Sequence, residues 1–242
     1  MIKLGEKWGS RYDFFDILRH YVALKIKDGI TLKNWYECGE FIRDPKMYLV
    51  NGFIPSRTSV IYDIGAQYAD YAIYWAIKYG CRIYAFEGLP WNYVKAVNNA
   101  VCNLGLMNHW DIFSDIHIYN VMVGNGAAIG YNSNEGMAFF DSNPRNLTQS
   151  VALDSFAFDS GILLPDIIKI DVEGFEYQVL LGSLKLIKTK MPRIIVETHS
   201  LELRSKVHDL LISLGYELRH IGRTVQGKQA WMDQITNLFY SP

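Results

Sequence analysis

The feature that most constrains this fold is an alternation beginning near residue 60, where short apolar runs are separated by longer amphipathic segments. The short runs suit buried strands, and the longer segments repeat with helical spacing. A helix between two strands places those strands parallel, so the alternation predicts an α/β domain on a mostly parallel sheet. The expected strands are residues 60–64, 82–86, 116–122, 167–171, 193–197, 216–223 and 235–240, and the expected helices are 69–79, 90–104, 174–188 and 200–214.

The end of the chain breaks this alternation. Residues 224–231 separate the last two expected strands without a helical pattern, which predicts an antiparallel hairpin at one edge of the sheet. A dehydrogenase-type Rossmann domain is expected to continue with parallel units. A Rossmann-like sheet of about seven strands that closes in an antiparallel hairpin instead resembles the class I methyltransferases.

The first part of the chain has a different pattern. Residues 11–27 carry apolar side chains at helical spacing before Asp28-Gly29, and a second short helix is expected over residues 31–43. We therefore expect a helical N-terminal cap over residues 1–55 and a core domain over residues 56–242. The Gly-, Asn- and Ser-rich segment between residues 123 and 150 is expected to hold a small β-hairpin and a mobile loop.

Charge and cysteine content narrow the classes of partner. The 24 Lys and Arg against 25 Asp and Glu give a formal net charge of -1, without the broad positive surface of a nucleic-acid binder. No stretch approaches the ~18 consecutive apolar residues of a membrane-spanning helix, and no apolar signal region is present at the N-terminus. Three scattered cysteines suit a reducing cytoplasm. We expect a cytoplasmic protein without nucleic-acid or membrane partners.

The first core strand ends in a turn suited to a ligand. Gly65 allows a sharp turn and a close approach of the backbone, and the following helix offers free N–H groups to a carboxylate or phosphate. A plain strand-to-helix turn, with glycine for close packing, is the alternative.

An acidic residue follows the second strand. Glu87 stands about 20 residues beyond the glycine turn, the interval at which a carboxylate can accept from both ribose hydroxyls of an adenosine. A simple carboxylate at a helix N-terminus is the alternative, but the strand end and the spacing together favour a ligand role.

Residues 167–182 resemble the signature of the FkbM family of methyltransferases. The block Lys-Ile-Asp-Val-Glu-Gly at residues 169–174 is its most distinctive part. Further matches stand at residues 62–66, 85–87, 151–156 and 192–199, so that the resemblance covers about residues 60–200.

The resemblance implies S-adenosylmethionine in a crevice at the sheet edge, with methyl transfer to a hydroxyl oxygen of a small molecule or sugar. Gln67 stands where the family usually has Asn, and Ala69 stands where it usually has Gly. The expected cofactor-binding residues are Asp63, Gly65, Ala66, Gln67, Tyr68 and Glu87.

Three polar residues follow neighbouring strands of the expected sheet. The alternation of side chains along a strand places Asp171 on one face of its strand, and places Glu197 with His199 on one face of the next. If the strands are neighbours, the three side chains converge beside the crevice. We favour His199 as the base, oriented by a carboxylate, because its usual pKa lies near neutrality.

Two other interpretations of these residues stay open. Lys169 could form a structural ion pair with a carboxylate while His199 caps the next helix. The Asp, Glu and His side chains could also bind a divalent ion, but their spacing is not diagnostic, and no metal is assigned.

The sequence therefore predicts an S-adenosylmethionine-dependent O-methyltransferase. The alternatives are a degenerate methyltransferase fold that acts as a binding or scaffold module, suggested by Gln67 and Ala69, and a nicotinamide-dependent oxidoreductase. The latter lacks support, because the full dinucleotide fingerprint is absent and the terminal hairpin is present.

Overall fold

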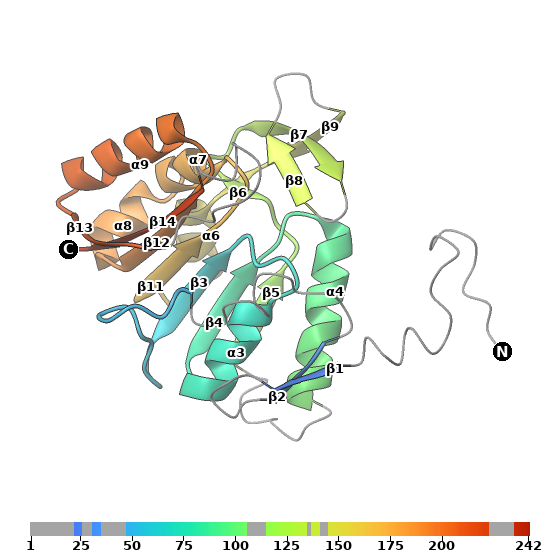
Figure 1. Cartoon of the computed structure of the whole chain (residues 1–242). Helices are drawn as coiled ribbons and strands as arrows, with labels where there is room; N and C mark the ends of the chain where they lie inside the picture. The colour runs from blue at the N-terminus through green and yellow to red at the C-terminus, as the bar shows by residue number, and fades with distance from the viewer. Residues whose placement is uncertain are drawn as a thin grey trace.

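The computed structural model describes residues 22–25, 31–34, 47–105, 115–134, 137–140, 145–222 and 235–242. Its centre is a seven-stranded sheet with the strand order β13-β14-β12-β11-β3-β4-β5 (Figure 1), which confirms the predicted sheet. The strands are β3 (Val60–Ile64), β4 (Arg82–Phe86), β5 (Ile116–Tyr119), β11 (Ile167–Ile170), β12 (Arg193–Thr198), β13 (Glu217–Ile221) and β14 (Thr236–Ser241).

The sheet is parallel except at its C-terminal end. Strand β14 runs antiparallel to both β12 and β13, and it lies between them. Most residues of β14 are buried, whereas most of β13 are exposed. The predicted antiparallel hairpin is confirmed, with its second strand inside the sheet and its first strand at the edge.

Helices cover both faces of the sheet (Figure 1). The apolar core on one face includes Ile61, Ile83 and Ile167 together with residues of α3 and α4. The core on the other face includes Ile168 and Ile170 together with residues of the later helices. The helices are α3 (Asp70–Tyr79), α4 (Pro90–Ala100), α6 (Leu153–Ser160), α7 (Glu176–Leu181), α8 (Leu184–Lys190) and α9 (Leu201–Ser213).

Two details of these helices differ from the sequence prediction. The single helix expected over residues 174–188 is two helices, α7 and α8, separated at Gly182 and Ser183. An added Cβ at Gly182 would lie 1.9 Å from the backbone oxygen of Gly124. The chain at the break between the two helices therefore packs closely against the backbone of residue 124. Helix α6 was not expected.

The order of the strands predicts where a ligand would bind at the edge of the sheet. Strand β3 pairs in parallel with β4 on one side and with β11 on the other. The chain therefore proceeds from β3 outward to β5 and returns across the sheet to β11. Ligands in such sheets bind outside the carboxyl ends of the strands where the direction reverses, which is the edge where residues 65, 87 and 171 follow their strands.

The N-terminal prediction is wrong where the structure describes that region. Val22–Lys25 and Thr31–Asn34 form two antiparallel strands, β1 and β2, in place of the expected helices. The Asp28-Gly29 pair that we took as a helix end is equally typical of a β-hairpin turn. The other residues up to 46 lie outside the described part of the chain.

The expected boundary between residues 55 and 56 stays a prediction. Tyr48 and Phe53 lie ahead of it, yet both are buried in the same core cluster as α3. The last residues of the expected cap thus pack as part of the sheet domain.

The segment after β5 contains more strands than the hairpin we expected. β7 (Ala128–Asn134) pairs antiparallel with both β8 (Met137–Phe140) and β9 (Asn146–Gln149). β6 (Val123–Gly124) and β10 (Val151–Ala152) flank this small sheet as a parallel pair. Residues 135–136 and 141–144 of this segment lie outside the described residues, and the mobile loop expected between residues 123 and 150 stays a prediction.

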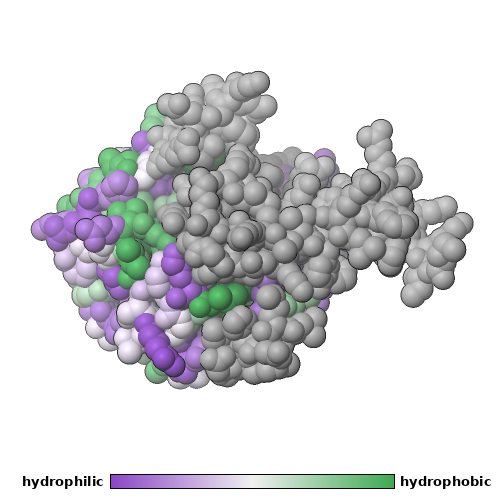
Figure 2. All heavy atoms as spheres, turned by 60° about the horizontal axis from the view of Figure 1, so that its bottom comes forward, coloured by the Kyte–Doolittle hydropathy of each residue, from purple (hydrophilic) through white to green (hydrophobic). Residues whose placement is uncertain are grey.

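Two observations concern contact with a membrane: the apolar character of the helices and the distribution of hydrophobic residues on the surface. Among the described residues, no helix combines the length and the apolar character needed to cross a bilayer. On the face shown in Figure 2, the hydrophobic residues among those described form several small groups separated by hydrophilic ones.

Gly65 fixes how closely the turn after β3 approaches the end of β11. Its φ is 78°, in the region that favours glycine. An added Cβ would lie 1.7 Å from the backbone oxygen of Asp171, so the turn after β3 packs directly on the end of β11.

We predict that Gly65→Ala lowers the free energy of unfolding by about 2 to 5 kcal/mol, because left-handed strain and overpacking add. Gly161→Ala is the matched control: its φ is 65°, but an added Cβ meets nothing within 4 Å, so only the strain of about 1 to 2 kcal/mol applies. Urea unfolding measures both, and equal losses for the two variants would contradict the packing role.

Candidate active site

A buried ion pair lies beneath the carboxyl ends of the central strands. Lys169 on β11 and Asp63 on β3 are Cα partners in the parallel register. Lys169 Nζ lies 3.0 Å from Asp63 Oδ1 and 3.7 Å from Asp171 Oδ2. Burial alone lowers the pKa of Lys169, but the charges of Asp63 and Asp171 outweigh it and raise that pKa above its usual range. The ammonium group stays charged and attracts both carboxylates.

Tyr48 joins this ion pair to the neighbouring strand. Its hydroxyl lies 3.3 Å from Asp171 Oδ2 and 3.0 Å from Glu197 Oε2, so it can donate to either carboxylate. The Lys169 ammonium also lies 5.3 Å from the centre of the Tyr48 ring. Tyr48 was not among the site residues expected from the sequence, because a lone tyrosine between two expected elements carries no local signal of a role.

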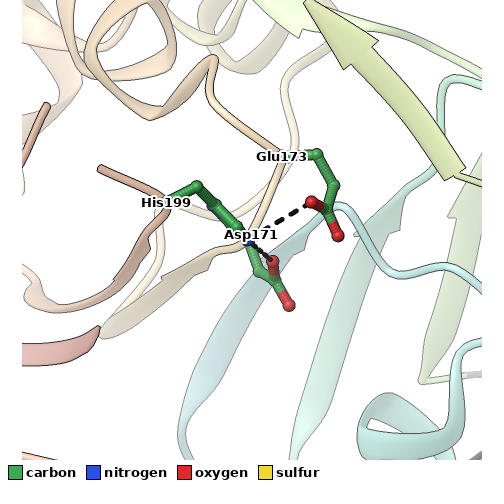
Figure 3. A group of neighbouring side chains, drawn as sticks. All are labelled: Asp171, Glu173 and His199. Atoms are coloured by element: carbon green, nitrogen blue, oxygen red, sulfur yellow. Dashed lines mark ion pairs between the residues drawn. The ribbon is translucent and has the colours of Figure 1, made fainter. Parts of the chain in front are cut away.

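His199 lies at the centre of the exposed side of the cluster. Its Nδ1 is 2.7 Å from Glu176 Oε1. Its Nε2 is 3.5 Å from Glu173 Oε2, 3.7 Å from Asp171 Oδ1 and 3.9 Å from Glu197 Oε1. Figure 3 shows the carboxylates of Asp171 and Glu173 directed towards the imidazole. The expected convergence of Asp171, Glu197 and His199 is therefore present.

Glu176 holds the loop that carries two of these carboxylates. It is fully buried, and its Oε1 also accepts from the backbone N–H groups of Gly174 at 3.0 Å and Val172 at 3.4 Å. Glu173 in this loop has a φ of 54°, a strained value for a residue with a side chain. Glu176 was not among the expected site residues either, although it stands within the family-like block.

The charge state of His199 counts against the base role that we favoured from the sequence. Burial alone lowers the pKa of His199, but the hydrogen bond and charge of Glu176 and the charges of Asp171 and Glu173 raise it to about 10. The imidazole is therefore a cation at neutral pH and has no free lone pair. Helix α9 is capped by Ser200, whose side chain accepts an N–H of the first turn, so His199 is not the cap.

Glu87 lies at the end of β4, facing the turn after β3. Its Oε2 accepts from Gln67 N at 2.9 Å, and its Oε1 accepts from Leu89 N at 2.8 Å and Asn92 Nδ2 at 3.4 Å. Burial raises the pKa of Glu87 to about 7, although these N–H groups oppose the rise. A carboxylate has about four lone-pair sites, so Glu87 can accept one further hydroxyl, and a second if the long contact to Asn92 opens. This fits a ribose.

The turn after β3 contains Gln67 and Ala69, the two residues that depart from the family pattern. Gln67 has a φ of 49° and Ala69 a φ of 60°. The usual Asn and Gly are the residue types that adopt such values most readily. Gln67 and Ala69 adopt the same backbone at a cost of about 1 to 2 kcal/mol each, so the turn is kept.

Three other residues expected to bind the cofactor are largely buried. Asp63 is enclosed in the ion pair with Lys169, and Ala66 and Tyr68 pack in the core. The Tyr68 hydroxyl accepts from Lys95 Nζ at 3.2 Å. The contacts of these three residues with a cofactor stay a prediction. The structural ion pair of Lys169 with a carboxylate, which was the alternative interpretation, is present.

Comparisons with known proteins agree with this geometry. The family model described as the methyltransferase FkbM domain matches residues 63–218, more than half of the chain. The sequence itself matches none of the curated proteins with which it was compared.

Three solved structures show the same fold. The structure of the methyltransferase FkbM from Methylobacillus flagellatus KT is 17% identical with a TM-score of 0.55, and the match covers 81% of this chain but only 47% of that one. Precorrin-6y C5,15-methyltransferase from Geobacter metallireducens GS-15 is 13% identical with a TM-score of 0.51, over 92% and 98% of the two chains. A Streptococcus pneumoniae protein described as a candidate tRNA (m1A22) methyltransferase is 14% identical with a TM-score of 0.51, over 81% and 68%.

The pKa of His199 predicts a pH-dependent stability. The folded protein holds the imidazole proton more tightly than the unfolded chain, whose histidine pKa is about 6.5. This contribution is therefore fully present below pH ~6.5 and is lost as the pH rises towards the folded pKa of about 10.

We predict that the difference in unfolding free energy between wild type and His199→Gln shrinks by on the order of 3 to 5 kcal/mol from pH 6.5 to 10. Urea unfolding at several pH values measures it. His220→Gln is the control, because His220 packs on Phe239 outside the cluster. A difference that does not change with pH would contradict the ion pairing.

Proposed function

This chain belongs to the FkbM methyltransferase family, and from that premise we propose that it transfers a methyl group from S-adenosylmethionine to a hydroxyl oxygen of a small molecule or sugar. The observation that carries the proposal is the pairing of Glu87 with the turn after β3. Beside it, a cluster of carboxylates follows the adjoining strands.

The cofactor side of the proposal rests on Glu87. Its carboxylate is oriented by the N–H groups of Gln67 and Leu89 and keeps acceptor sites for ribose hydroxyls. Gly65 brings the turn against the end of β11, so that little space separates the two strand ends. S-adenosylmethionine, when bound, supplies a methyl group on a sulfonium that an oxygen can attack in line.

The acceptor side rests on the carboxylates after β11 and β12. The side chains of Asp171 and Glu173 are 20% and 33% exposed, so both can hydrogen-bond an acceptor hydroxyl. The imidazolium of His199 holds these two carboxylates in place. The base role that we first gave to His199 then falls to Asp171 or Glu197, and such a base is worth about 100- to 10,000-fold in rate.

The negative character of this cluster also bears on the acceptor class. Four carboxylates lie within 4 Å of the His199 ring nitrogens, which disfavours an acceptor rich in phosphate. A neutral hydroxylated molecule fits the cluster, and we propose that nucleic acid is not the substrate.

We predict that S-adenosylhomocysteine binds more tightly as the pH rises through 7, because only ionised Glu87 can use all its oxygens as acceptors. With a pKa of about 7 for Glu87, the dissociation constant should fall about 10-fold from pH 6 to 8. Isothermal calorimetry measures this in wild type and in Glu87→Gln, which should bind weakly at both pH values. Absence of binding at millimolar ligand would overturn the proposal.

Transfer itself is tested with labelled methyl donor and a panel of sugars and hydroxylated small molecules. Wild type should label at least one hydroxyl, while Asp171→Asn and Glu197→Gln should bind S-adenosylhomocysteine normally but transfer more slowly. Cofactor binding without transfer to any panel member would favour the binding-module alternative.

A further inference from the structure

The spacing around His199 Nε2 is unusual for an ion-paired histidine. Its neighbours are oxygens of Glu173 at 3.5 Å, Asp171 at 3.7 Å and Glu197 at 3.9 Å. A charge-assisted hydrogen bond would bring one of them to about 2.7 to 2.9 Å. The carboxylates surround this nitrogen at a distance that leaves room between them.

The other ring nitrogen is fixed by a buried carboxylate. Glu176 Oε1 lies 2.7 Å from Nδ1, and Glu176 itself is fully buried. A metal ion would displace the proton from Nε2, and the proton left on Nδ1 would keep the Nε2 lone pair directed towards Asp171 and Glu173. Histidines that bind metals almost always donate their other N–H to a carboxylate, carbonyl or water in this way.

A buried oxygen without a partner lies next to this contact. Glu176 Oε2 makes no hydrogen bond to any described residue and is inaccessible to solvent. A buried acceptor of this kind normally has a partner, such as an ordered water or a group bound at the site. This observation is independent of the spacing around Nε2, and it shows that the described residues do not satisfy all the buried polar atoms around His199.

The cluster also carries an excess of negative charge. Among the described residues, the ion pairs of this cluster join five carboxylates to two cations when His199 is protonated. These groups are Asp63, Asp171, Glu173, Glu176 and Glu197, with Lys169 and His199. A divalent cation would offset much of this excess.

We propose that Asp171, Glu173 and His199 bind a divalent transition-metal ion of the Mn²⁺ type (Figure 3). One ligand atom from each residue lies within 4.8 Å of the other two. Ligands about 2.1 Å from a common ion lie about 3.0 to 3.4 Å apart, so only small inward movements are needed. The imidazole favours a transition-metal ion over Mg²⁺ or Ca²⁺, which prefer oxygen alone, and the two carboxylates suit Mn²⁺.

The metal site stands on these side chains and does not require methyl transfer. Its role in the reaction does rest on the proposed function: an ion there would bind the acceptor hydroxyl oxygen beside the cofactor crevice. Binding of metal and binding of S-adenosylhomocysteine are therefore measured separately, so that failure of one does not imply failure of the other.

The test is a titration of the full chain, freed of metals by a chelator, with Mn²⁺ at pH 8. Electron paramagnetic resonance counts free Mn²⁺ by its six-line spectrum, and electron spin echo modulation detects a coordinated nitrogen. We expect one bound ion per chain, with modulation from one imidazole nitrogen. Competition with Mg²⁺ should need a large excess of Mg²⁺.

Matched variants assign the ligands. Glu173→Gln and His199→Gln should each weaken binding at least about 10-fold, and His199→Gln should also abolish the nitrogen modulation. Glu176→Gln should weaken binding about 10- to 100-fold and keep that modulation. Glu202→Gln is the control, because Glu202 is an exposed carboxylate paired with Lys206 on α9. Circular dichroism checks that each variant is folded.

Two results would overturn the proposal. One is a wild-type chain that leaves millimolar Mn²⁺ free in solution. The other is a folded Glu173→Gln or His199→Gln variant that binds Mn²⁺ as tightly as wild type, because the ion would then lie elsewhere.

Discussion

The candidate site depends on one buried cation. Lys169 lies in the central strand β11, where a charge without a partner would cost several kcal/mol, and it is enclosed by the carboxylates of Asp63 and Asp171. The parallel register of β3 and β11 sets Lys169 opposite Asp63, so the sheet itself makes the contact. Asp171 is thereby held at the strand end, where Tyr48 also contacts it.

From this ion pair the site extends outward in steps. Asp171 faces His199, whose other nitrogen is held by Glu176, and Glu176 in turn holds the loop that carries Glu173. On the cofactor side, Gly65 packs against the backbone of residue 171, and the same turn meets the carboxylate of Glu87. The proposed cofactor side and the proposed acceptor side are therefore linked through a few residues at two adjacent strand ends.

Regular patterns in the sequence predicted most of the fold. Alternation of apolar runs gave the strands and the antiparallel ending, and side-chain alternation brought Asp171, Glu197 and His199 together. The rest depends on tertiary context: Tyr48 reaches Glu197 across 149 positions, and Glu176 became important only through its buried contact with His199. The charge of His199 likewise depends on carboxylates that are distant in the sequence, so no local pattern predicts it. The Asp28-Gly29 pair shows the converse, because one local signal is typical of both a helix end and a hairpin.

The most direct test of this account is a double-mutant cycle between Lys169 and Asp63, measured by urea unfolding. Lys169→Met alone leaves buried carboxylates without their cation and should cost about 3 to 5 kcal/mol. Adding Asp63→Asn should reduce that loss, with a coupling energy of about 1 to 3 kcal/mol. A Lys169→Met variant as stable as wild type, or losses that simply add, would contradict the claim that this ion pair organises the site.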